Sequence, residues 1–578
     1  MKTTNNQINP IYTEETECQD CYKCLRQCPV KAIRIQDGHA QVIPELCIMC
    51  GKCVDLCPVG AKKFRNDVND VKKMLSKKQD VYVSLAPSAF SEFKKIGINR
   101  LITALKKAGF KGVSETALGA ELVNQQIADQ YKSQENQIGI TSACPTVVKY
   151  ITKYKSAYAD NILPVLSPLL AHCKYLKKQY GQDSKIVFIG PCIAKKSEAD
   201  ENPELLEYAL TFEEARILLA DNGINLKYIN PANGAQFEPD LAGDGAFYPI
   251  EGGSLKGLEK ILPEARENMI SSSGIDSTIE MFERLDGSNF ADKVILELLA
   301  CNGGCINGPL AGNNNQLSSA HTIIQDASQR KGQVPNSQKL DIWHNYPKKS
   351  VQSRAYSKEK INSALREIGK YSESDELNCS SCGYDSCRDF ARALLNGKAE
   401  KTMCISYMKQ LAQKKTDALM NAIPAGVVMV DDDLKIVDSN KKFAEICGKD
   451  AETVFEAKPG MEGALLDKIS PFSEEFRQLF NQEKELIEKD KTIGENVYHL
   501  TIFNIEKNRI AGGIIQDITD PAVEKTVIIK KARKVIENNL KTVQKIAYLL
   551  GENASETEII LNSIVENFSP ENMEEIES

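Results

Sequence analysis

The stretches CQDCYKCLRQCP (residues 18–29) and CIMCGKCVDLCP (residues 47–58) decide the fold at the start of the chain, because each places four cysteines on one short loop. Both runs share the same cysteine spacing, and a proline follows the last cysteine of each. Short spacings let one loop wrap around a metal cluster, and the proline then ends that loop. The repeated run predicts two iron–sulfur clusters, with a pair of zinc knuckles as the weaker alternative.

The composition of the 578-residue chain fits a soluble protein of several domains, with 42% hydrophobic residues. Eighteen cysteines against five histidines favour thiolate-ligated iron over mixed Cys/His zinc sites. A net charge of −7 argues against nucleic acid as the main partner. The polar N-terminus shows no signal peptide, and no apolar run approaches the roughly 18–20 residues that span a bilayer. We therefore expect a cytoplasmic protein without a membrane segment.

Each cysteine run resembles that of the bacterial ferredoxins, which we expect to form a domain over residues 1–75. In that family the first three cysteines of a run hold one cubane and the fourth reaches across to the other. The resemblance implies one 4Fe–4S cluster on Cys18, Cys21, Cys24 and Cys57. It implies a second 4Fe–4S cluster on Cys28, Cys47, Cys50 and Cys53.

Strand-like and helical stretches alternate in the central region, which predicts an α/β domain over residues 76–350. The expected strands are VYVSLAP (81–87), KIVFIG (185–190) and KVILELLA (293–300), and NRLITALKKAGF (99–110) is an expected helix. Because α/β folds place their sites at strand ends, reactive residues after such runs are candidates. They are Cys144 in TSACP, Cys192 in GPCIAKKSE, and Cys301 and Cys305 in ELLACNGGCINGP.

These cysteine segments, with VSLAPSAF (83–90) and GFKGVSETALGAEL (109–122), resemble the FeFe hydrogenases over most of residues 80–345. In that family four cysteines hold a 4Fe–4S cubane, and one of them bridges to a two-iron subsite carrying CO, cyanide and an azadithiolate. The resemblance implies that Cys144, Cys192 and Cys301 ligate the cubane and that Cys305 is the bridge. It implies that Lys195 donates to one cyanide and that Pro87 and Ser88 contact the other, because charge-assisted hydrogen bonds are the strong ones.

The chain departs from that family at the proton relay. Catalytic members usually read Thr-Ser-Cys-Cys-Pro, whereas this chain has Ala143 in place of the first of those cysteines. That cysteine passes protons to the azadithiolate amine, and alanine has no exchangeable proton. Since a positioned acid is worth about 10²–10⁴ in rate, Ala143 predicts slow turnover. Gly190 and Leu299 replace methionines of the family, and Gln126-Ile127 falls where we expect a pair of proton-path glutamates.

A further cysteine group, Cys379, Cys382, Cys387 and Cys404, follows a polar linker. It resembles the small 4Fe–4S domain of carbon monoxide dehydrogenase/acetyl-CoA synthase subunits and predicts a fourth 4Fe–4S cluster in residues 373–412. All-cysteine zinc sites share such spacings, so zinc stays open as an alternative. Cys173 and Cys447 match no motif, and we expect both to be core residues.

Residues 413–520 resemble a PAS domain. A helix that ends at Pro424 leads into GVVMVDDDLKIVDSNKKFAEICG (426–448), which predicts strand, acidic turn, strand and helix. YHLTIFNIE (498–506) and RIAGGIIQDITD (509–520) predict two more strands. Apolar residues after Pro521 recur at steps of three and four, which predicts a helical tail over residues 521–578. Whether that tail forms a coiled coil or packs on the PAS core stays open.

Three functions remain compatible with these motifs. The first is a sensory FeFe hydrogenase of the type found in anaerobic bacteria, which binds and slowly cleaves or forms hydrogen and relays redox state to the PAS domain. The second is a metabolic, ferredoxin-linked FeFe hydrogenase, which Ala143 disfavours. The third is an iron–sulfur redox or assembly protein without the two-iron subsite, which Lys195, Ser88 and Cys305 disfavour.

The PAS domain favours the sensory function, by analogy at the level of fold. The expected partners are hydrogen and protons, a redox protein such as ferredoxin, and a signalling protein reached through the PAS domain and tail. A second copy of the chain, paired through the tail, is a further expected partner.

Overall fold

The computed structural model describes residues 9–519 except 78, 132–136, 286–291, 313–315, 331, 333–339, 352–353 and 482–484, together with residues 534 and 541. Apart from residues 534 and 541, the predicted tail helix lies outside this described part. The chain divides into two compact units, one of Met1–Ser357 with Asn396–Ala399 and one of Lys358–Leu395 with Glu400–Ser578. None of the helices in the described ranges has the length and apolar character needed to cross a bilayer.

The first unit begins with the two cysteine runs, each of which contains one short helix. These helices are α1 (Lys23–Arg26) and α2 (Lys52–Asp55). Around them β1 (Ile11–Thr13) pairs antiparallel with β4 (Lys62–Phe64), and β2 (Ile33–Gln36) pairs antiparallel with β3 (His39–Val42). Gly51 precedes α2 at a φ of +78°, and a Cβ there would lie 2.5 Å from Pro309 Cγ. Glycine thus lets the second run approach the central domain closely.

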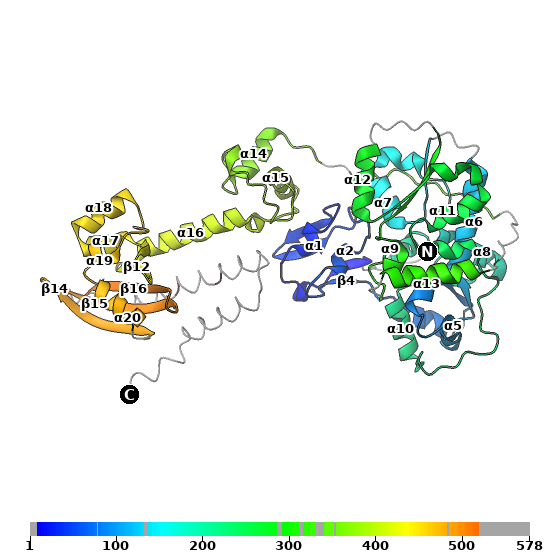
Figure 1. The fold of residues 1–578 in the computed structure, drawn as a ribbon, viewed down its shortest axis with the longest axis horizontal. Coiled ribbons are helices and arrows are strands. Elements are labelled where there is room, and N and C mark those ends of the chain that lie inside the picture. Colours follow the sequence, from blue (N-terminus) through cyan, green and yellow to red (C-terminus); the bar gives the residue numbers. More distant parts are fainter. Residues whose placement is uncertain are drawn as a thin grey trace. The chain divides into compact units, whose positions relative to one another are not determined.

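Two parallel sheets form the centre of the first unit (Figure 1). One has the order β6-β5-β8-β9 and the other β10-β11-β7. Their most buried strands are mainly apolar runs, as parallel strands covered on both faces require. The strands are β5 (Val81–Leu85), β6 (Gly112–Glu115), β7 (Ile138–Ile140), β8 (Lys185–Ile189), β9 (Tyr208–Leu210), β10 (Met269–Ser273) and β11 (Val294–Leu299).

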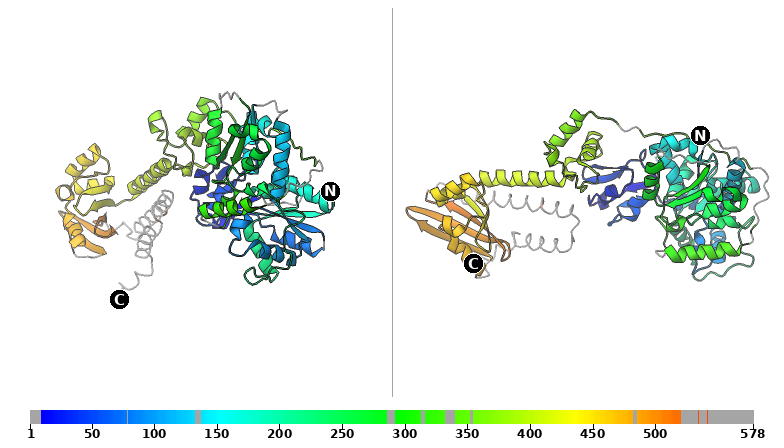
Figure 2. Two further views of the ribbon diagram at one scale, coloured as in Figure 1. Left: turned by 45° about the vertical axis from the view of Figure 1, so that its right-hand side comes forward. Right: turned by 45° about the horizontal axis from the view of Figure 1, so that its top comes forward.

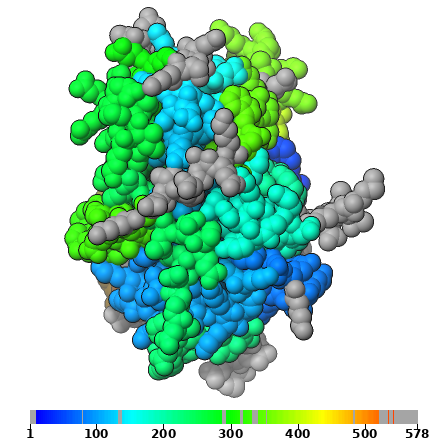
Figure 3. Space-filling model, turned by 90° about the vertical axis from the view of Figure 1, so that its right-hand side faces the viewer, coloured from blue at the N-terminus to red at the C-terminus, as the bar shows by residue number. Residues whose placement is uncertain are grey.

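Helices pack against these sheets and close the core. α6 packs against α8 and α11, and residues of α5, α6, α8 and α10 belong to one apolar cluster with β5 and β8. Segments from the early, middle and late parts of the unit's sequence lie side by side on one face of the unit (Figure 3). The helices are α3 (Val68–Ser76), α4 (Ala89–Glu92), α5 (Ile98–Lys107), α6 (Thr116–Tyr131), α7 (Pro145–Tyr154), α8 (Pro168–Tyr180), α9 (Ala194–Glu201), α10 (Phe212–Asp221), α11 (Gly253–Ile261), α12 (Ile275–Leu285) and α13 (Gln316–Gln329).

The second unit joins a small helical part to an antiparallel sheet. α14 (Lys358–Arg366) packs against α15 (Cys387–Leu395), and the long α16 (Ile405–Ala422) runs into the sheet (Figure 2). The sheet has the order β13-β12-β16-β15-β14. Its strands are β12 (Gly426–Asp431), β13 (Ile436–Ser439), β14 (Leu486–Ile493), β15 (Asn496–Glu506) and β16 (Ile510–Asp517). Between the strands lie α17 (Lys441–Cys447), α18 (Lys449–Ala457), α19 (Leu466–Ile469) and α20 (Ser473–Asn481).

The strands and helices expected from the sequence are present in both units. The runs at residues 81–87, 185–190 and 293–300 contain β5, β8 and β11, and the helix expected over residues 99–110 is α5. In the second unit, the expected strand, turn, strand and helix are β12, β13 and α17. The mixed α/β prediction is therefore confirmed.

Candidate metal centres

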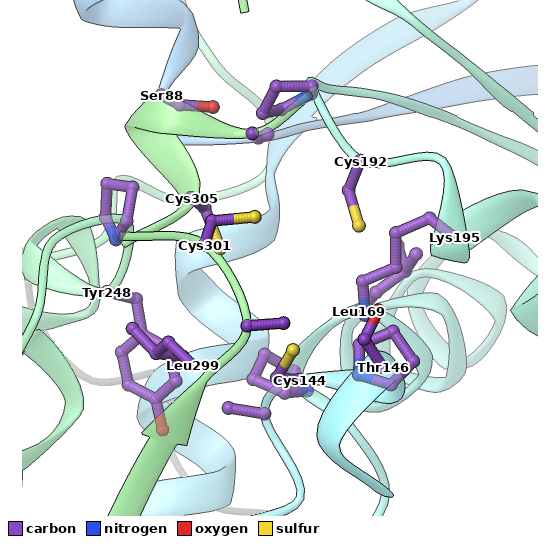
Figure 4. Close-up of a pocket in the computed structure, with 18 of the residues that line it drawn as sticks. Ser88, Cys144, Thr146, Leu169, Cys192, Lys195, Tyr248, Leu299, Cys301 and Cys305 are labelled. Atoms are coloured by element: carbon purple, nitrogen blue, oxygen red, sulfur yellow. The ribbon is translucent and has the colours of Figure 1, made fainter. Parts of the chain in front are cut away.

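One cavity of about 100 Å³ lies at the carboxyl ends of five parallel strands of the first unit. Segments that follow β5, β6, β7, β8 and β11 supply much of its wall, as expected for a site in an α/β fold. All eight residues that the sequence predicts for this site line it: Pro87, Ser88, Ala143, Cys144, Cys192, Lys195, Cys301 and Cys305. Figure 4 shows side chains from these segments arranged around the open space.

The thiols in this cavity are desolvated. Burial raises the pKa of Cys192 to about 11 and raises the pKa of Cys301 and of Cys305 well above the ordinary thiol value. Without a metal these side chains therefore stay protonated at neutral pH. Iron binds the thiolate and displaces the proton, so four convergent thiols in an enclosed, mainly apolar space fit a 4Fe–4S cluster.

Lys195 is held in place by a carboxylate that the sequence analysis did not single out. Its Nζ donates to Glu198 Oε2 at 2.6 Å and reaches Ser167 Oγ at 3.5 Å. Burial lowers the pKa of Lys195, but the charges of Glu198 and Cys192 outweigh it, and the pKa is raised overall. Lys195 thus remains a cation on the cavity wall. The three-residue spacing on α9 was the signal that could have revealed Glu198.

Ser88 presents a buried hydroxyl with no hydrogen-bond partner among the described residues. The side chain is 2% exposed and lies at the start of α4. A buried polar atom without a partner costs free energy, so such a group in a folded protein calls for an explanation. An anionic ligand in the cavity would accept this hydrogen bond, and Ser88 therefore fits the role that the resemblance implies.

Ala143 places a methyl group on the cavity wall beside Cys144. The polar side chains that share the wall, apart from the cysteines and Lys195, are the hydroxyl groups of Ser88, Thr116, Thr146 and Tyr248. Within the described residues, no carboxylate or imidazole lines the cavity. The wall therefore lacks a side chain that titrates readily as a proton relay near neutral pH.

The other departures from the family have separate outcomes. Leu299 lines the cavity, whereas Gly190 leaves room for the ring of Phe188, which does line it. A Cβ at Gly190 would lie 2.4 Å from Phe188 Cζ. Gln126 and Ile127 lie on α6, and Ile127 belongs to the apolar core. Neither of them lines the cavity.

The ferredoxin-like cysteines form two groups that cross between the runs. Burial raises the pKa of Cys24 to about 11, and the thiols whose charges add to this are Cys18, Cys21 and Cys57. In the same way Cys28 interacts with the thiols of Cys47, Cys50 and Cys53. These are the two ligand sets that the resemblance to ferredoxins implies.

The second of these groups lies next to the cavity. Met49 and Cys50 line the cavity wall, and Cys50 interacts electrostatically with Cys301. The Cys28–Cys47–Cys50–Cys53 group is therefore the nearer of the two ferredoxin-like groups to the central site. Because electron transfer favours short separations between centres, this group is the better placed to exchange electrons with that site.

The cysteines of the second unit also converge. Burial raises the pKa of Cys382 to about 11, and the charges of Cys404, Cys379 and Cys387 contribute. Cys404 is the residue that precedes α16, so this group lies at the start of the helix that enters the antiparallel sheet.

The cysteines without a motif lie apart from these groups. Cys173 is fully buried on α8, and Cys447 packs against the apolar core of the antiparallel sheet. His499 bonds through Nδ1 to Asp490 Oδ1 at 2.5 Å across two paired strands. These contacts give all three residues structural roles.

Comparison with protein families agrees with this arrangement along the chain. Residues 79–309 match the family described as "Iron only hydrogenase large subunit, C-terminal domain". Residues 17–61 match a 4Fe–4S dicluster domain, residues 375–406 match an Fe–S cluster family, and residues 414–486 match a PAS domain. The four predicted domain types, a 4Fe–4S dicluster domain, an iron-hydrogenase domain, a small Fe–S domain and a PAS domain, are therefore confirmed.

Curated relatives are hydrogenases of low identity. Iron hydrogenase 1 of Clostridium pasteurianum is 23% identical over 283 residues, which cover 39% of this chain and 49% of that protein. The periplasmic [Fe] hydrogenase large subunit of Nitratidesulfovibrio vulgaris is 24% identical over 376 residues, which cover 53% of this chain and 87% of that protein. The chain thus spans about half the length of the clostridial relative.

A solved structure of [FeFe]-hydrogenase HydA1 from Chlamydomonas reinhardtii is 17% identical, with a TM-score of 0.36, and covers 50% of this chain and all of that one. The family matches and the converging cysteines identify the chain as an FeFe-hydrogenase-like protein that carries a PAS domain.

Proposed function

We propose that this protein is a sensory FeFe hydrogenase, which binds hydrogen at an H-cluster, turns it over slowly and relays the redox state to its PAS domain. The observation that carries the proposal is the methyl group of Ala143 beside Cys144, on a cavity wall without a carboxylate or imidazole among the described residues. Proton transfer by a positioned acid is worth about 10²–10⁴ in rate. A sensor needs binding and a redox change, so it tolerates the loss of that factor.

The cofactor of this proposal fits the side chains around the cavity. Cys144, Cys192 and Cys301 would hold the cubane, with Cys305 as the bridge to the two-iron subsite. When bound, such a cluster supplies an iron centre and an amine base for heterolytic hydrogen cleavage.

The chain itself supplies the surroundings of that cofactor. The mainly apolar wall excludes water, which strengthens every electrostatic interaction inside. Lys195 Nζ, anchored by Glu198, and Ser88 Oγ supply donors for anionic ligands. The loop with Met49 and Cys50 offers electrons a protein path out of the cavity.

A metabolic FeFe hydrogenase is the second candidate. The dicluster domain favours it, because two close clusters suit electron exchange with a soluble carrier such as ferredoxin. The sensory proposal differs in its output, which is a protein contact made by the PAS domain or the tail. The sensory proposal also includes a cytoplasmic location and a signalling protein as the partner.

The two candidates differ in turnover, so the rate of hydrogen oxidation separates them. The protein, matured with the two-iron cofactor, is assayed with an artificial electron acceptor beside a metabolic hydrogenase matured in the same way. The sensory proposal expects a rate about 10²–10⁴ lower per active site. A rate equal to that of the metabolic enzyme contradicts it. Protein that takes up no two-iron cofactor supports an iron–sulfur redox or assembly role instead.

A further inference from the structure

Lys62 is a buried lysine in the ferredoxin-like region that has no carboxylate partner among the residues the structure describes. It lies on β4 opposite Thr13 of β1, and it is only 4% exposed. Nζ donates to Thr13 Oγ1 and, at 2.7 Å, to the carbonyl oxygen of Ala40. Both acceptors are neutral, and no carboxylate within the described residues forms an ion pair with Lys62.

A buried ammonium group without a counter-charge is costly. Removing a charge from water is costly even after relaxation, and lysine is therefore almost never fully buried without a partner. Two hydrogen bonds to neutral oxygens satisfy donors but leave the charge itself uncompensated. The folded protein must place negative charge near Lys62 when its clusters are in place.

The ligand groups of both predicted ferredoxin clusters supply that charge. β4, which carries Lys62, packs against α2, which carries Cys53, and α2 packs against α1, which carries Cys24. Burial raises the pKa of both thiols, and the positive charge of Lys62 acts against that rise at each of them. Cys24 belongs to the group of Cys18, Cys21 and Cys57, whereas Cys53 belongs to the other group. Lys62 is therefore close enough to both groups to act on each.

We propose that Lys62 is the shared counter-ion of the two ferredoxin-type clusters and raises the reduction potential of both. The inference rests on the assignment of two 4Fe–4S clusters to these eight cysteines. Four thiolates make an oxidised cluster anionic, and reduction adds one electron and one further negative charge. A fixed cation stabilises the reduced form more than the oxidised form, so the potential rises. No bond is made or broken, and the electron comes from an external reductant.

The test is an EPR-monitored redox titration of the full-length protein with dithionite, before and after Lys62→Met. Methionine keeps the length of the buried side chain and removes its charge. We expect the equilibrium constant for one-electron reduction of each ferredoxin cluster to fall about tenfold, which corresponds to about 59 mV. The two clusters are recognised by the magnetic coupling between their reduced forms.

Lys63→Met is the matched control. Lys63 is the next residue on β4, its side chain is 36% exposed, and it pairs with Glu17 Oε1 at 2.8 Å. The substitution makes the same change of charge on the opposite face of the strand, where water and salt screen it. We expect potentials close to those of the unmodified protein. Equal shifts in both variants, or no shift in Lys62→Met with both clusters present, would overturn the inference.

Loss of clusters in Lys62→Met also gives a result, through the charge-preserving variant Lys62→Arg. Clusters that form in Lys62→Arg but not in Lys62→Met support a requirement for the charge. Loss in both variants shows that Lys62 serves packing alone and overturns the inference. Unmodified protein that lacks the coupled EPR signal instead refutes the two-cluster assignment, which is a separate failure.

Discussion

The methyl group of Ala143 lines the cavity that contains Cys144, Cys192, Cys301 and Cys305. The resemblance to the FeFe hydrogenases implies that this is the position of the relay cysteine. Ala143→Cys restores a thiol beside Cys144. We expect it to raise the rate of hydrogen oxidation by matured protein about 10²–10⁴-fold. Ala143→Ser is the control, because a serine hydroxyl of similar size is a much weaker acid and should give little gain. Equal rates in all three proteins would show that proton transfer at residue 143 does not limit turnover.

His172 is a fully buried imidazole whose two ring nitrogens bond to Ser84 Oγ at 2.8 Å and to Ser114 Oγ at 2.9 Å. Burial lowers the pKa of His172 to about 3, so the folded protein keeps it neutral. The unfolded chain takes up this proton near pH 6.5. The contribution of His172 to stability is therefore fully present above about pH 6.5 and is lost as the pH falls toward about 3.

The measurement is thermal unfolding under anaerobic conditions at about pH 7.5 and about pH 5.5. We expect His172 to account for about 1.4 kcal/mol of the stability lost between these values. His172→Gln keeps a hydrogen-bonding side chain that does not titrate and should lose less stability over the same range. An identical pH dependence in the variant would mean that His172 is protonated in the folded protein.

Among single residues, the proposed cysteine ligands were predictable from the sequence, whereas Glu198 and His172 were not. Cysteine spacing within a segment reports directly on cluster binding, so the twelve proposed ligands of residues 18–57 and 379–404 could be named in advance. The four proposed ligands of the central cavity were named from the resemblance to the FeFe hydrogenases. Glu198 and His172 escaped notice because their roles depend on burial, which the sequence does not display. Only the spacing of Lys195 and Glu198 on one helix gave a local signal.

At the scale of elements, the space beside the end of β8 is filled by the ring of Phe188, because Gly190 has no side chain there. A Cβ at Gly190 would lie 2.4 Å from Phe188 Cζ and 2.8 Å from Ala86 Cβ. Gly190→Ala should therefore destabilise the protein by about 1–3 kcal/mol through overpacking. Phe188→Leu removes the tip of the ring, so the double variant should recover much of that loss.

A double-mutant cycle of thermal unfolding checks this coupling. We expect a favourable interaction free energy between the two substitutions, of about 0.5–3 kcal/mol. Additive effects would mean that the cavity wall adapts to a side chain at residue 190 without moving Phe188.

Element prediction succeeded for strands with long, mainly apolar runs and missed the charged strand β14. The buried strands β5, β8 and β11 could be recognised because parallel strands are covered on both faces. β14 escaped prediction because it is the edge strand of its sheet, with the sequence LIEKDKTI and mostly exposed side chains. Charged edge strands protect sheets against association and carry little pattern.

At the scale of the whole molecule, the second unit contains a direct link between its cysteine group and the PAS sheet. Cys404 precedes α16, and α16 ends four residues before β12. Asn440 Nδ2 holds that end by donating to the carbonyl oxygens of Met420 at 3.0 Å and Ala425 at 2.8 Å. A change at the cysteine group therefore has a helical path into the PAS domain.

Cys387→Ser should break this path while leaving the central cavity untouched. We expect hydrogen binding, followed by infrared spectroscopy, to persist, and the hydrogen-dependent change in amide exchange of residues 426–517 to disappear. Cys447→Ser, in the PAS core and outside the cysteine group, is the control and should retain the coupling. Coupling that survives Cys387→Ser would remove the cysteine group from the signalling path.

The order of domain types along the chain was predictable because each type has its own local pattern. The convergence of Ala143, Ser88 and Lys195 on one cavity was not derivable from spacing, because they follow strands of two different sheets. The resemblance to a known family carried that expectation, and the geometry of the cavity agrees with it.

Infrared spectroscopy of the matured protein, under argon and then under hydrogen, shows whether the cavity holds a two-iron subsite that binds hydrogen. The CO and cyanide ligands of a two-iron subsite absorb where protein does not, and their bands report its redox state. We predict such bands in the protein and a shift of the bands when hydrogen is admitted. Absent bands, or bands that hydrogen leaves unchanged, would contradict a hydrogen-binding sensor.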